Sequence, residues 1–449
     1  MIDPILVAAS LYAGLIRLLE ENMLRKIRSL IFLTTSLAML AACGTPTRSI
    51  IATPAEVKPL AATPLPDLPA VRIARHPEPG KLDSFNPAPS LVPTFDPNSS
   101  NNFQIDFRAS NLTDLDLSKS MDLLNLANFD TWTKWPPADK LPAGFSVQQT
   151  METGKDPGLG IRELHAKGIT GRGVGIAIID QTLLVDHQEY ANQLRVYEEA
   201  EDVTGGWLQT SMHGPAVASI AVGNTVGVAP QADLYFIASG VCQGGITDAS
   251  SDFTCLAKDV LRVIAINQGL PEGRKIRVLS MSIGWAKGQK GYREITDAVN
   301  KAKAAGIFVV SSSISDSYGF HFLGLGRNSQ QDPNQFASYL PGAWWAQGFY
   351  TGKINLTKTL LVPMDARTTA SPTGIHDYTY YGEGGLSWVI PYIAGMYALA
   401  WQVDPGLTPQ EFWSTALQTG QTTQIEHNGK SFSLGVILDP KALIAAIQK

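Results

Sequence analysis

Residues 384–395 read GGLSWVIPYIAG, a serine that follows two glycines and precedes an almost wholly apolar run reaching Leu399. A run of this length, apolar on all sides, is typical of a helix buried inside a fold. Because proline is tolerated only in the first turn of a helix, Pro391 predicts that the helix begins near Ser387. The unpaired N–H groups and positive dipole end favour negative charge developing there. Ser387 is therefore either a nucleophile whose oxyanion is stabilised by the helix, or a capping residue.

Two earlier stretches favour the nucleophile. Residues 174–180 read VGIAIID, an apolar and β-branched run that ends in Asp180, as when a buried parallel strand delivers a carboxylate at its carboxyl end. Residues 212–221 read MHGPAVASIA and place His213 at the expected start of an apolar-faced helix. An acid, a histidine and a serine in this chain order form one of the arrangements of the hydrolytic triad.

From about Gly158 to the C-terminus, the sequence resembles the subtilisin-like (S8 family) serine proteases. The matching motifs, in the family's order, are Asp180, then His213-Gly214 with Val217-Ala218, then residues 278–284 (VLSMSIG), then Gly385, Ser387, Pro391 and Ala394-Gly395. The resemblance implies that Ser387 attacks a peptide carbonyl, His213 acts as the general base, and Asp180 orients the histidine. It also implies that Ser282, Ile283 and Gly284 pair with the substrate backbone as an added strand. We prefer His213 to His187 as the base because His187 falls in a polar loop.

The chain departs from the family at the oxyanion site. Where the family has an asparagine after the strand equivalent to residues 307–310, our alignment places Ser315. A serine hydroxyl could donate with a shorter reach, and Asn328 is a second candidate donor. Losing one oxyanion donor costs on the order of 10² to 10³ in rate. Two functions therefore stay open: an active serine endopeptidase, and a catalytically silent domain that binds peptides or protein partners.

An α/β-hydrolase esterase is a weaker alternative. Its Gly-x-Ser-x-Gly elbow needs a glycine where this chain has Val389, and its acid and histidine follow the serine in the chain.

The remaining pattern alternates strands and helices. We expect strands at 234–238, 276–283, 307–312 and 360–363, and helices at 159–167, 255–267, 292–305, 408–418 and 440–448. This alternation predicts an α/β fold, a subtilisin-like, mostly parallel sheet with helices on both faces. Active sites of such sheets lie at the carboxyl ends of strands. Residues 368–385 read as a polar connection, rich in Tyr and Gly, that brings Ser387 to the site.

The N-terminal region contains a complete signal-peptide pattern that begins at Met23, so we expect Met23 rather than Met1 to be the true start. The basic segment 23–28 and the apolar segment 29–39 precede Leu40-Ala41-Ala42-Cys43, which resembles the bacterial lipoprotein cleavage motif. We expect Cys43 to carry lipid and to anchor an exported protein on the outer side of the bacterial cell membrane. The alternative is an ordinary secretory signal with an incidental cysteine.

We divide the chain into four segments. They are an N-terminal extension with the signal peptide (1–42), a Pro-rich tether (43–102), an N-terminal arm packed on the catalytic domain (103–157) and the peptidase domain (158–449). In the arm, we expect Trp132, Trp135 and residues 141–145 to supply the apolar contacts. The arm is also a hypothetical inhibitory propeptide.

The composition of the chain indicates which kinds of molecule it binds. A hydrophobic content of 44% with 17% charged residues suits a folded core, and a net charge of -5 gives no basic face for nucleic acid. We expect a polypeptide substrate and a monomer. The chemistry requires no cofactor or metal; family members often bind structural calcium, but no spacing here identifies its ligands. Cys242 and Cys255 either form a disulfide or remain free thiols.

Overall fold

The computed structural model describes residues 56–81, 91–97, 99, 101, 103–200, 208–240, 242 and 251–448. The predicted signal peptide and lipidated Cys43 lie outside the described residues.

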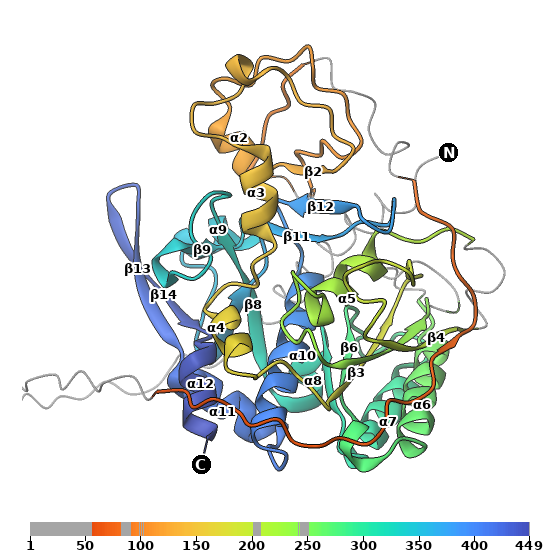
Figure 1. The fold of residues 1–449 in the computed structure, drawn as a ribbon. Helices are drawn as coiled ribbons and strands as arrows, with labels where there is room; N and C mark the ends of the chain where they lie inside the picture. Colours follow the sequence, from red (N-terminus) through yellow and green to blue (C-terminus); the bar gives the residue numbers. More distant parts are fainter. Residues whose placement is uncertain are drawn as a thin grey trace, which may run out of the picture.

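The centre of the fold is a six-stranded sheet in which all neighbouring strands run parallel, in the order β1-β4-β5-β3-β6-β7 (Figure 1). Its strands are β1 (Arg72–Ile73), β3 (Gly175–Asp180), β4 (Leu194–Glu199), β5 (Asp233–Ala238), β6 (Ile276–Met281) and β7 (Phe308–Ser311). Every residue of β3 and β5 is buried, which accounts for their continuous apolar sequences. The predicted α/β fold with a parallel sheet is confirmed.

Helices cover both faces of this sheet. They are α5 (His213–Val222) and α10 (Leu386–Val403) on one face, and α6 (Thr254–Gln268) and α7 (Tyr292–Ala304) on the other. Successive side chains of a strand point to opposite faces. Accordingly, Ile176 and Ile178 pack with α5 and α10, whereas Ala177 and Ile179 pack with α6 and α7.

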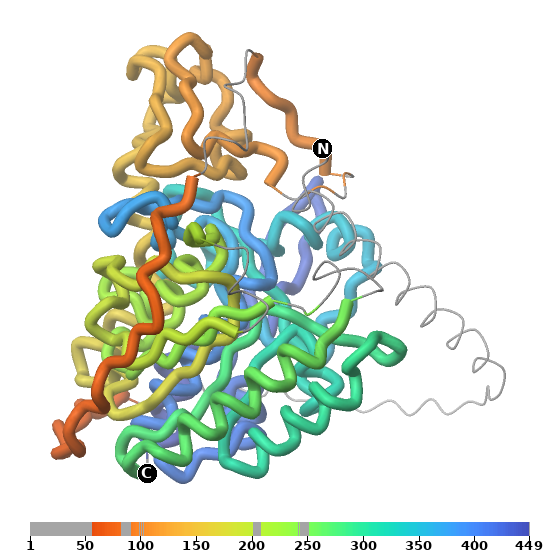
Figure 2. Tube along the Cα trace, turned by 90° about the vertical axis from the view of Figure 1, so that its right-hand side faces the viewer, coloured from red at the N-terminus to blue at the C-terminus, as the bar shows by residue number. Residues whose placement is uncertain are grey.

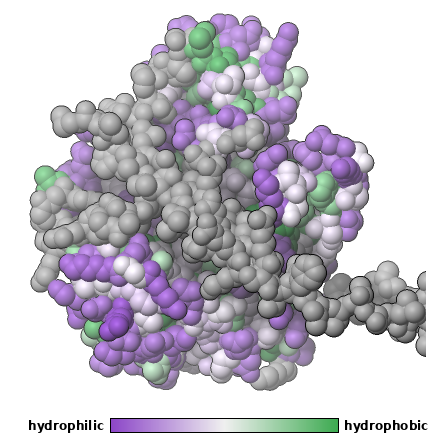
Figure 3. Space-filling view, turned by 180° about the vertical axis from the view of Figure 1, so that it is seen from behind, coloured by the Kyte–Doolittle hydropathy of each residue, from purple (hydrophilic) through white to green (hydrophobic). Residues whose placement is uncertain are grey.

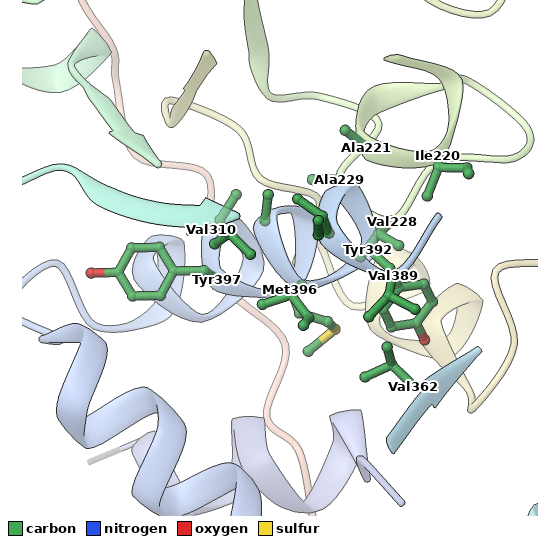
Figure 4. Packing of buried hydrophobic residues seen from close by; sticks show 14 of the residues in the cluster. Ile220, Ala221, Val228, Ala229, Val310, Val362, Val389, Tyr392, Met396 and Tyr397 are labelled. Atoms are coloured by element: carbon green, nitrogen blue, oxygen red, sulfur yellow. The ribbon is translucent and has the colours of Figure 1, made fainter. Parts of the chain in front are cut away.

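Helix α10 is the core of the domain, and every residue from Trp388 to Ala400 is buried. In Figure 4 its side chains lie among Ile220 of α5, Val310 of β7 and Val362 of β10. The helix is long and apolar enough to cross a membrane, but 72% of it is buried inside the protein. At Gly395 an added Cβ would lie 2.6 Å from Cβ of Val228, so glycine allows this close approach.

Pro391 is the sixth residue of α10, so the expectation that it lies in the first turn is wrong. A proline here cannot donate to the carbonyl four residues earlier, which is that of Ser387. The Ser282 hydroxyl donates to this carbonyl instead, at 3.0 Å. The proline is thus accommodated by a tertiary hydrogen bond that ties α10 to the end of β6.

A second sheet has the order β13-β14-β10-β8-β9, and a third has the order β11-β12-β2. Their strands are β8 (His321–Arg327), β9 (Tyr339–Pro341), β10 (Thr359–Pro363), β13 (Gln421–His427), β14 (Lys430–Ile437), β11 (Arg367–Ala370), β12 (Tyr378–Tyr381) and β2 (Asn128–Asp130). The interpretation of residues 368–385 as a polar connection is therefore incomplete. The segment forms an antiparallel hairpin because its Thr and Tyr side chains are buried.

The other α-helices are α2 (Met121–Leu126), α3 (Val147–Gly154), α4 (Ile161–Ala166), α8 (Ile314–Tyr318), α9 (Ala343–Tyr350), α11 (Pro409–Thr419) and α12 (Pro440–Ile447). A capping box begins α11, with Thr408 and Glu411 exchanging hydrogen bonds. Of the two cysteine alternatives, the structure has the disulfide: Cys242 and Cys255 are bonded, with 5.5 Å between their Cα atoms.

Residues 56–81 form a strap along the domain, seen as the red tube in Figure 2. They are extended, as a Pro-rich segment should be, but they pack on the domain instead of standing free of it. The Leu60 amide donates to the Lys167 carbonyl at 2.8 Å, β1 pairs with β4, and Arg75 forms an ion pair with Glu199 at 2.6 Å. Residues 56–81, which we predicted to be part of a tether, therefore contain the edge strand β1 and the extended segments on either side of it.

The arm, residues 103–157, packs on the domain at the top of Figure 1. It has its own small core, and β2 joins it to β12 in antiparallel pairing. Trp135 contacts Phe129 edge-on at 5.0 Å, as expected. Trp132, in contrast, is 60% exposed and its indole N–H donates to the Asp377 carboxylate at 2.7 Å. On the coloured part of the reverse face of the molecule, polar residues predominate (Figure 3).

Candidate active site

Asp180 and His213 meet at the carboxyl end of the central sheet. Asp180 is the last residue of β3, and His213 is the first residue of α5. Their side chains are joined by a hydrogen bond of 2.6 Å between Asp180 Oδ1 and His213 Nδ1. The Asp180 side chain is 5% exposed and that of His213 is 20% exposed. Gly214 lets α5 approach the turn after β3, because a Cβ there would lie 2.5 Å from the Thr182 carbonyl oxygen.

His187 is not part of this pair. It is fully buried rather than in an exposed polar loop, and its Nε2 lies 2.9 Å from the carbonyl oxygen of Asp377. Its ring stacks on Tyr190. Burial lowers the pKa of His187, which keeps it neutral in a structural position.

Ser387 lies in the first turn of α10 and is partly exposed. The next residue, Trp388, is buried, and its ring centroid lies 5.3 Å from that of His213. Ser387 also carries the carbonyl that accepts from Ser282. The fold therefore brings the three residues predicted from the sequence, far apart in the chain, into one neighbourhood.

The segment predicted to bind substrate follows β6. The Ile283 carbonyl accepts from the Ser312 amide at 3.0 Å, and a Cβ on Gly284 would lie 3.0 Å from that of Ser312. These contacts bind the segment to the end of β7. Through Ser282 it is also fixed to α10, so it lies beside Ser387.

The two candidate oxyanion donors occupy different places. Ser315 is exposed in α8 and lines a cavity of about 260 Å³ whose wall includes Leu386, the residue before Ser387. Asn328 follows β8, and the adjacent Ser329 is hydrogen-bonded to Asn125 of the arm. Of the two candidates, Ser315 shares this cavity with Leu386, and Asn328 is not among its lining residues.

The same cavity is lined by five apolar and four polar residues. Its lining residues are Ser312, Ile314, Ser315, Phe320, His321, Phe322, Leu323, Thr359 and Leu386. Within the described part of the chain, no three His, Cys, Asp or Glu side chains form a group that could hold a metal ion.

Two buried carboxyl groups flank the loop that leads to Ser387. Asp365 accepts from the Gly384 amide at 2.7 Å and from the Ala343 amide at 2.8 Å. Glu383 lies near the backbone amides of Phe103 and Gln104 in the arm, and both amides act to lower its pKa. Burial raises the pKa of each group to about 7, and the charge of Asp365 adds to the effect on Glu383. Neither group was singled out from the sequence, because only the tertiary fold buries them.

Sequence reasoning also missed an aromatic contact chain behind the histidine. Trp388 packs between His213 and Tyr381, whose ring centroid lies 5.1 Å from that of Trp388. In the sequence, Trp388 is one residue of the apolar run, and only the fold shows that it contacts His213.

Comparison with known proteins identifies the family of one segment of the chain. Residues 171–346 match the family model described as the subtilase family, Peptidase S8. This segment includes Asp180, His213 and Ser282–Gly284. The chain thus carries a subtilase-family segment, and the resemblance stated from the motifs is confirmed.

The curated relatives that match include two extracellular proteases. The chain is 25% identical over 308 residues to the minor extracellular protease Epr of Bacillus subtilis (strain 168), covering 65% of this chain and 42% of that protein. It is 23% identical over 299 residues to the extracellular serine proteinase of Thermus sp. (strain Rt41A), covering 65% of this chain and 67% of that protein. The chain therefore spans less than half the length of the first relative and about two thirds of the second.

Solved structures are similar at low identity. The prenylagaramide maturation protease PagA matches with a TM-score of 0.41 and 16% identity, over 59% of this chain and 89% of that one. A cold adapted subtilisin-like serine proteinase matches with a TM-score of 0.40 and 18% identity, over 56% and 83%.

The buried carboxyl pair predicts a stability that falls as pH rises. The pKa of Glu383 in the folded protein, about 7, exceeds its ordinary value of 4.5. Between these values the folded state binds more protons than the unfolded state, so the stabilisation present at pH 4–5 is lost as pH rises through 7. The free energy of unfolding should fall between pH 5 and pH 8, and Glu383→Gln should make this fall smaller by roughly 2 kcal/mol. Urea unfolding at pH 5 and pH 8 measures the free energy of unfolding of both proteins.

The control is Glu426→Gln, a change on the exposed face of β13. It should keep the pH dependence of the parent protein. If the free energy of unfolding changed with pH equally in the parent and in Glu383→Gln, the raised pKa of Glu383 would be contradicted.

Proposed function

We propose that the protein is a serine endopeptidase that hydrolyses peptide bonds through Asp180, His213 and Ser387 and an acyl-enzyme. The observation that carries the proposal is the 2.6 Å hydrogen bond between Asp180 and His213 beside the N-terminal turn of α10. Similarity to two proteins named as extracellular proteases supports both the reaction class and export.

The proposed proton transfers follow from the Asp180–His213 hydrogen bond. With Nδ1 facing the Asp180 carboxylate, the neutral imidazole carries its proton on Nδ1 and keeps a lone pair on Nε2. Nε2 then accepts the hydroxyl proton as Ser387 Oγ attacks the substrate carbonyl. The imidazolium donates that proton to the leaving amine, and a water molecule repeats the sequence to release the acyl group.

Oxyanion stabilisation falls to the first turn of α10 and to Ser315 in this proposal. Free N–H groups at a helix N-terminus favour an oxyanion next to Ser387. Ser315 faces the same cavity as Leu386, and its hydroxyl is the side-chain donor that we assign in place of asparagine.

The substrate is a polypeptide in an extended conformation, which would pair with Ser282–Gly284 as an added strand. The cavity that Leu386 lines also has Phe320, Phe322 and other apolar residues in its wall, and we propose that it takes an apolar side chain of that peptide. The reaction as proposed uses no metal or cofactor, and the protein is proposed to act as a monomer.

A fluorophosphonate probe tests the nucleophile. The detergent-solubilised parent chain should gain one adduct, read by intact mass, and Ser387→Ala should gain none. His213→Ala should slow labelling by more than about 10²-fold because the general base is lost. Ser414→Ala, an exposed serine on α11, serves as the matched control and should label like the parent. A folded parent that gains no adduct would contradict the proposal and favour the silent peptide-binding domain.

The proposed location is the outer side of the bacterial cell membrane, held by lipid on Cys43. Cells grown with an alkyne-tagged fatty acid should yield tagged parent protein in the membrane fraction. Cys43→Ala should be untagged and released from membranes. An untagged parent, or a Cys43→Ala chain that remains membrane-bound, would contradict the anchoring.

A further inference from the structure

A continuous line of buried contacts links the arm to His213. Trp388 is 1% exposed, with the His213 ring centroid at 5.3 Å on one side and that of Tyr381 at 5.1 Å on the other. Tyr381 ends β12 and is also 1% exposed. Ring contacts of this kind fix orientation as well as bury area.

The arm closes the other side of Tyr381. The Arg108 guanidinium lies 5.6 Å from the centroid of the Tyr381 ring, and its Nη1 is 3.4 Å from the hydroxyl. The Phe103 ring lies 6.0 Å from the same ring. Arg108 is itself held by an ion pair of 2.5 Å with Asp106. The Tyr381 ring is therefore held between Trp388 on one side and Arg108 and Phe103 of the arm on the other.

The indole of Trp388 depends on this packing. Its Nε1 is buried and has no hydrogen-bond partner among the described residues. An indole that is not anchored by a hydrogen bond takes its orientation from the rings on either side. Without Tyr381, the Trp388 ring would lose the contact that fixes its orientation. Without Trp388, the His213 ring could turn about the axis of its hydrogen bond to Asp180.

Resting on the proposed function, we infer that Trp388 and Tyr381 are positioning residues for His213, and that the arm is a permanent part of the active enzyme that supports them. The arm contacts the β11–β12 hairpin, the turn after β8 and the start of the loop that leads to Ser387, where the Glu383 amide donates to Asn128. This location differs from that of an inhibitory propeptide, which must cover the substrate-binding segment.

Steady-state kinetics on a peptide substrate test the positioning role. Trp388→Leu should lower kcat about 10- to 100-fold with KM within about twofold, because a misplaced general base impairs chemistry more than binding. Trp388→Phe should restore most of the loss. Tyr381→Leu should lower kcat similarly, whereas Tyr381→Phe, which keeps the ring and loses the hydroxyl, should behave like the parent.

Phe412→Leu is the matched control for lost aromatic packing. Phe412 is fully buried in α11 and contacts Tyr397 and Phe308, away from His213. It should lower the thermal midpoint and leave kcat unchanged. A kcat for Trp388→Leu equal to that of Phe412→Leu would overturn the inference.

The arm's permanence is tested by the mass of the probe-labelled protein. The labelled chain should still contain residues 103–157; a labelled chain that lacks them would overturn the inference while leaving the proposed nucleophile intact. A folded parent that neither labels nor hydrolyses peptide would refute the proposed function and this inference together. Labelled parent protein with unchanged Trp388→Leu kinetics would refute the inference alone.

Discussion

Complete burial of α10 is the constraint on which the arrangement of the site depends. Residues 388–400 are all buried, between the central sheet, α5 and the second sheet. Each large apolar side chain removed from water contributes about 1.5–3 kcal/mol, so the helix cannot shift without exposing several of them. Its first turn is therefore held at one place, where Ser387 lies next to the carboxyl end of β6. The serine is positioned by the core rather than by a flexible loop.

Asp180 and His213 are held by the central sheet and by the helix packed on it. β3 carries Asp180 to its carboxyl end, and the close approach at Gly214 sets α5 against the turn that follows. The hydrogen bond between Asp180 and His213 then spans two elements that are already fixed by packing. Such preorganisation lets a general base work without reorganising during the reaction. The strap and the arm extend this scaffold. The strap adds the edge strand β1, and the arm places Arg108 against the Tyr381 ring.

Much of this could be predicted from sequence because the signals are local. The apolar, β-branched run 174–179 is typical of a buried strand, and its terminal acid then lies at the strand's end. The apolar run after Ser387 required a buried helix. What could not be predicted depends on partners distant in the chain. The hydroxyl of Ser282 accommodates Pro391 in the second turn, and burial by the arm turns residues 368–385 into a hairpin. The Pro-rich composition of residues 56–81 indicated extension, but not the carbonyls of β4 and Lys167 that pair with them. The alignment favoured Ser315 as oxyanion donor over Asn328, and in the fold Ser315 lines a cavity together with Leu386.

The central claim is that Asp180 holds the His213 imidazole through Nδ1, leaving Nε2 for Ser387. Proton NMR of the detergent-solubilised protein measures this bond through the far-downfield resonance of an imidazole N–H donated to a carboxylate. The account predicts such a resonance in the parent protein and its disappearance in Asp180→Asn, with the resonance retained in Asp186→Asn, which alters the exposed contact of Asp186 with His76. A parent spectrum without the resonance, or one unchanged by Asp180→Asn, would contradict the account.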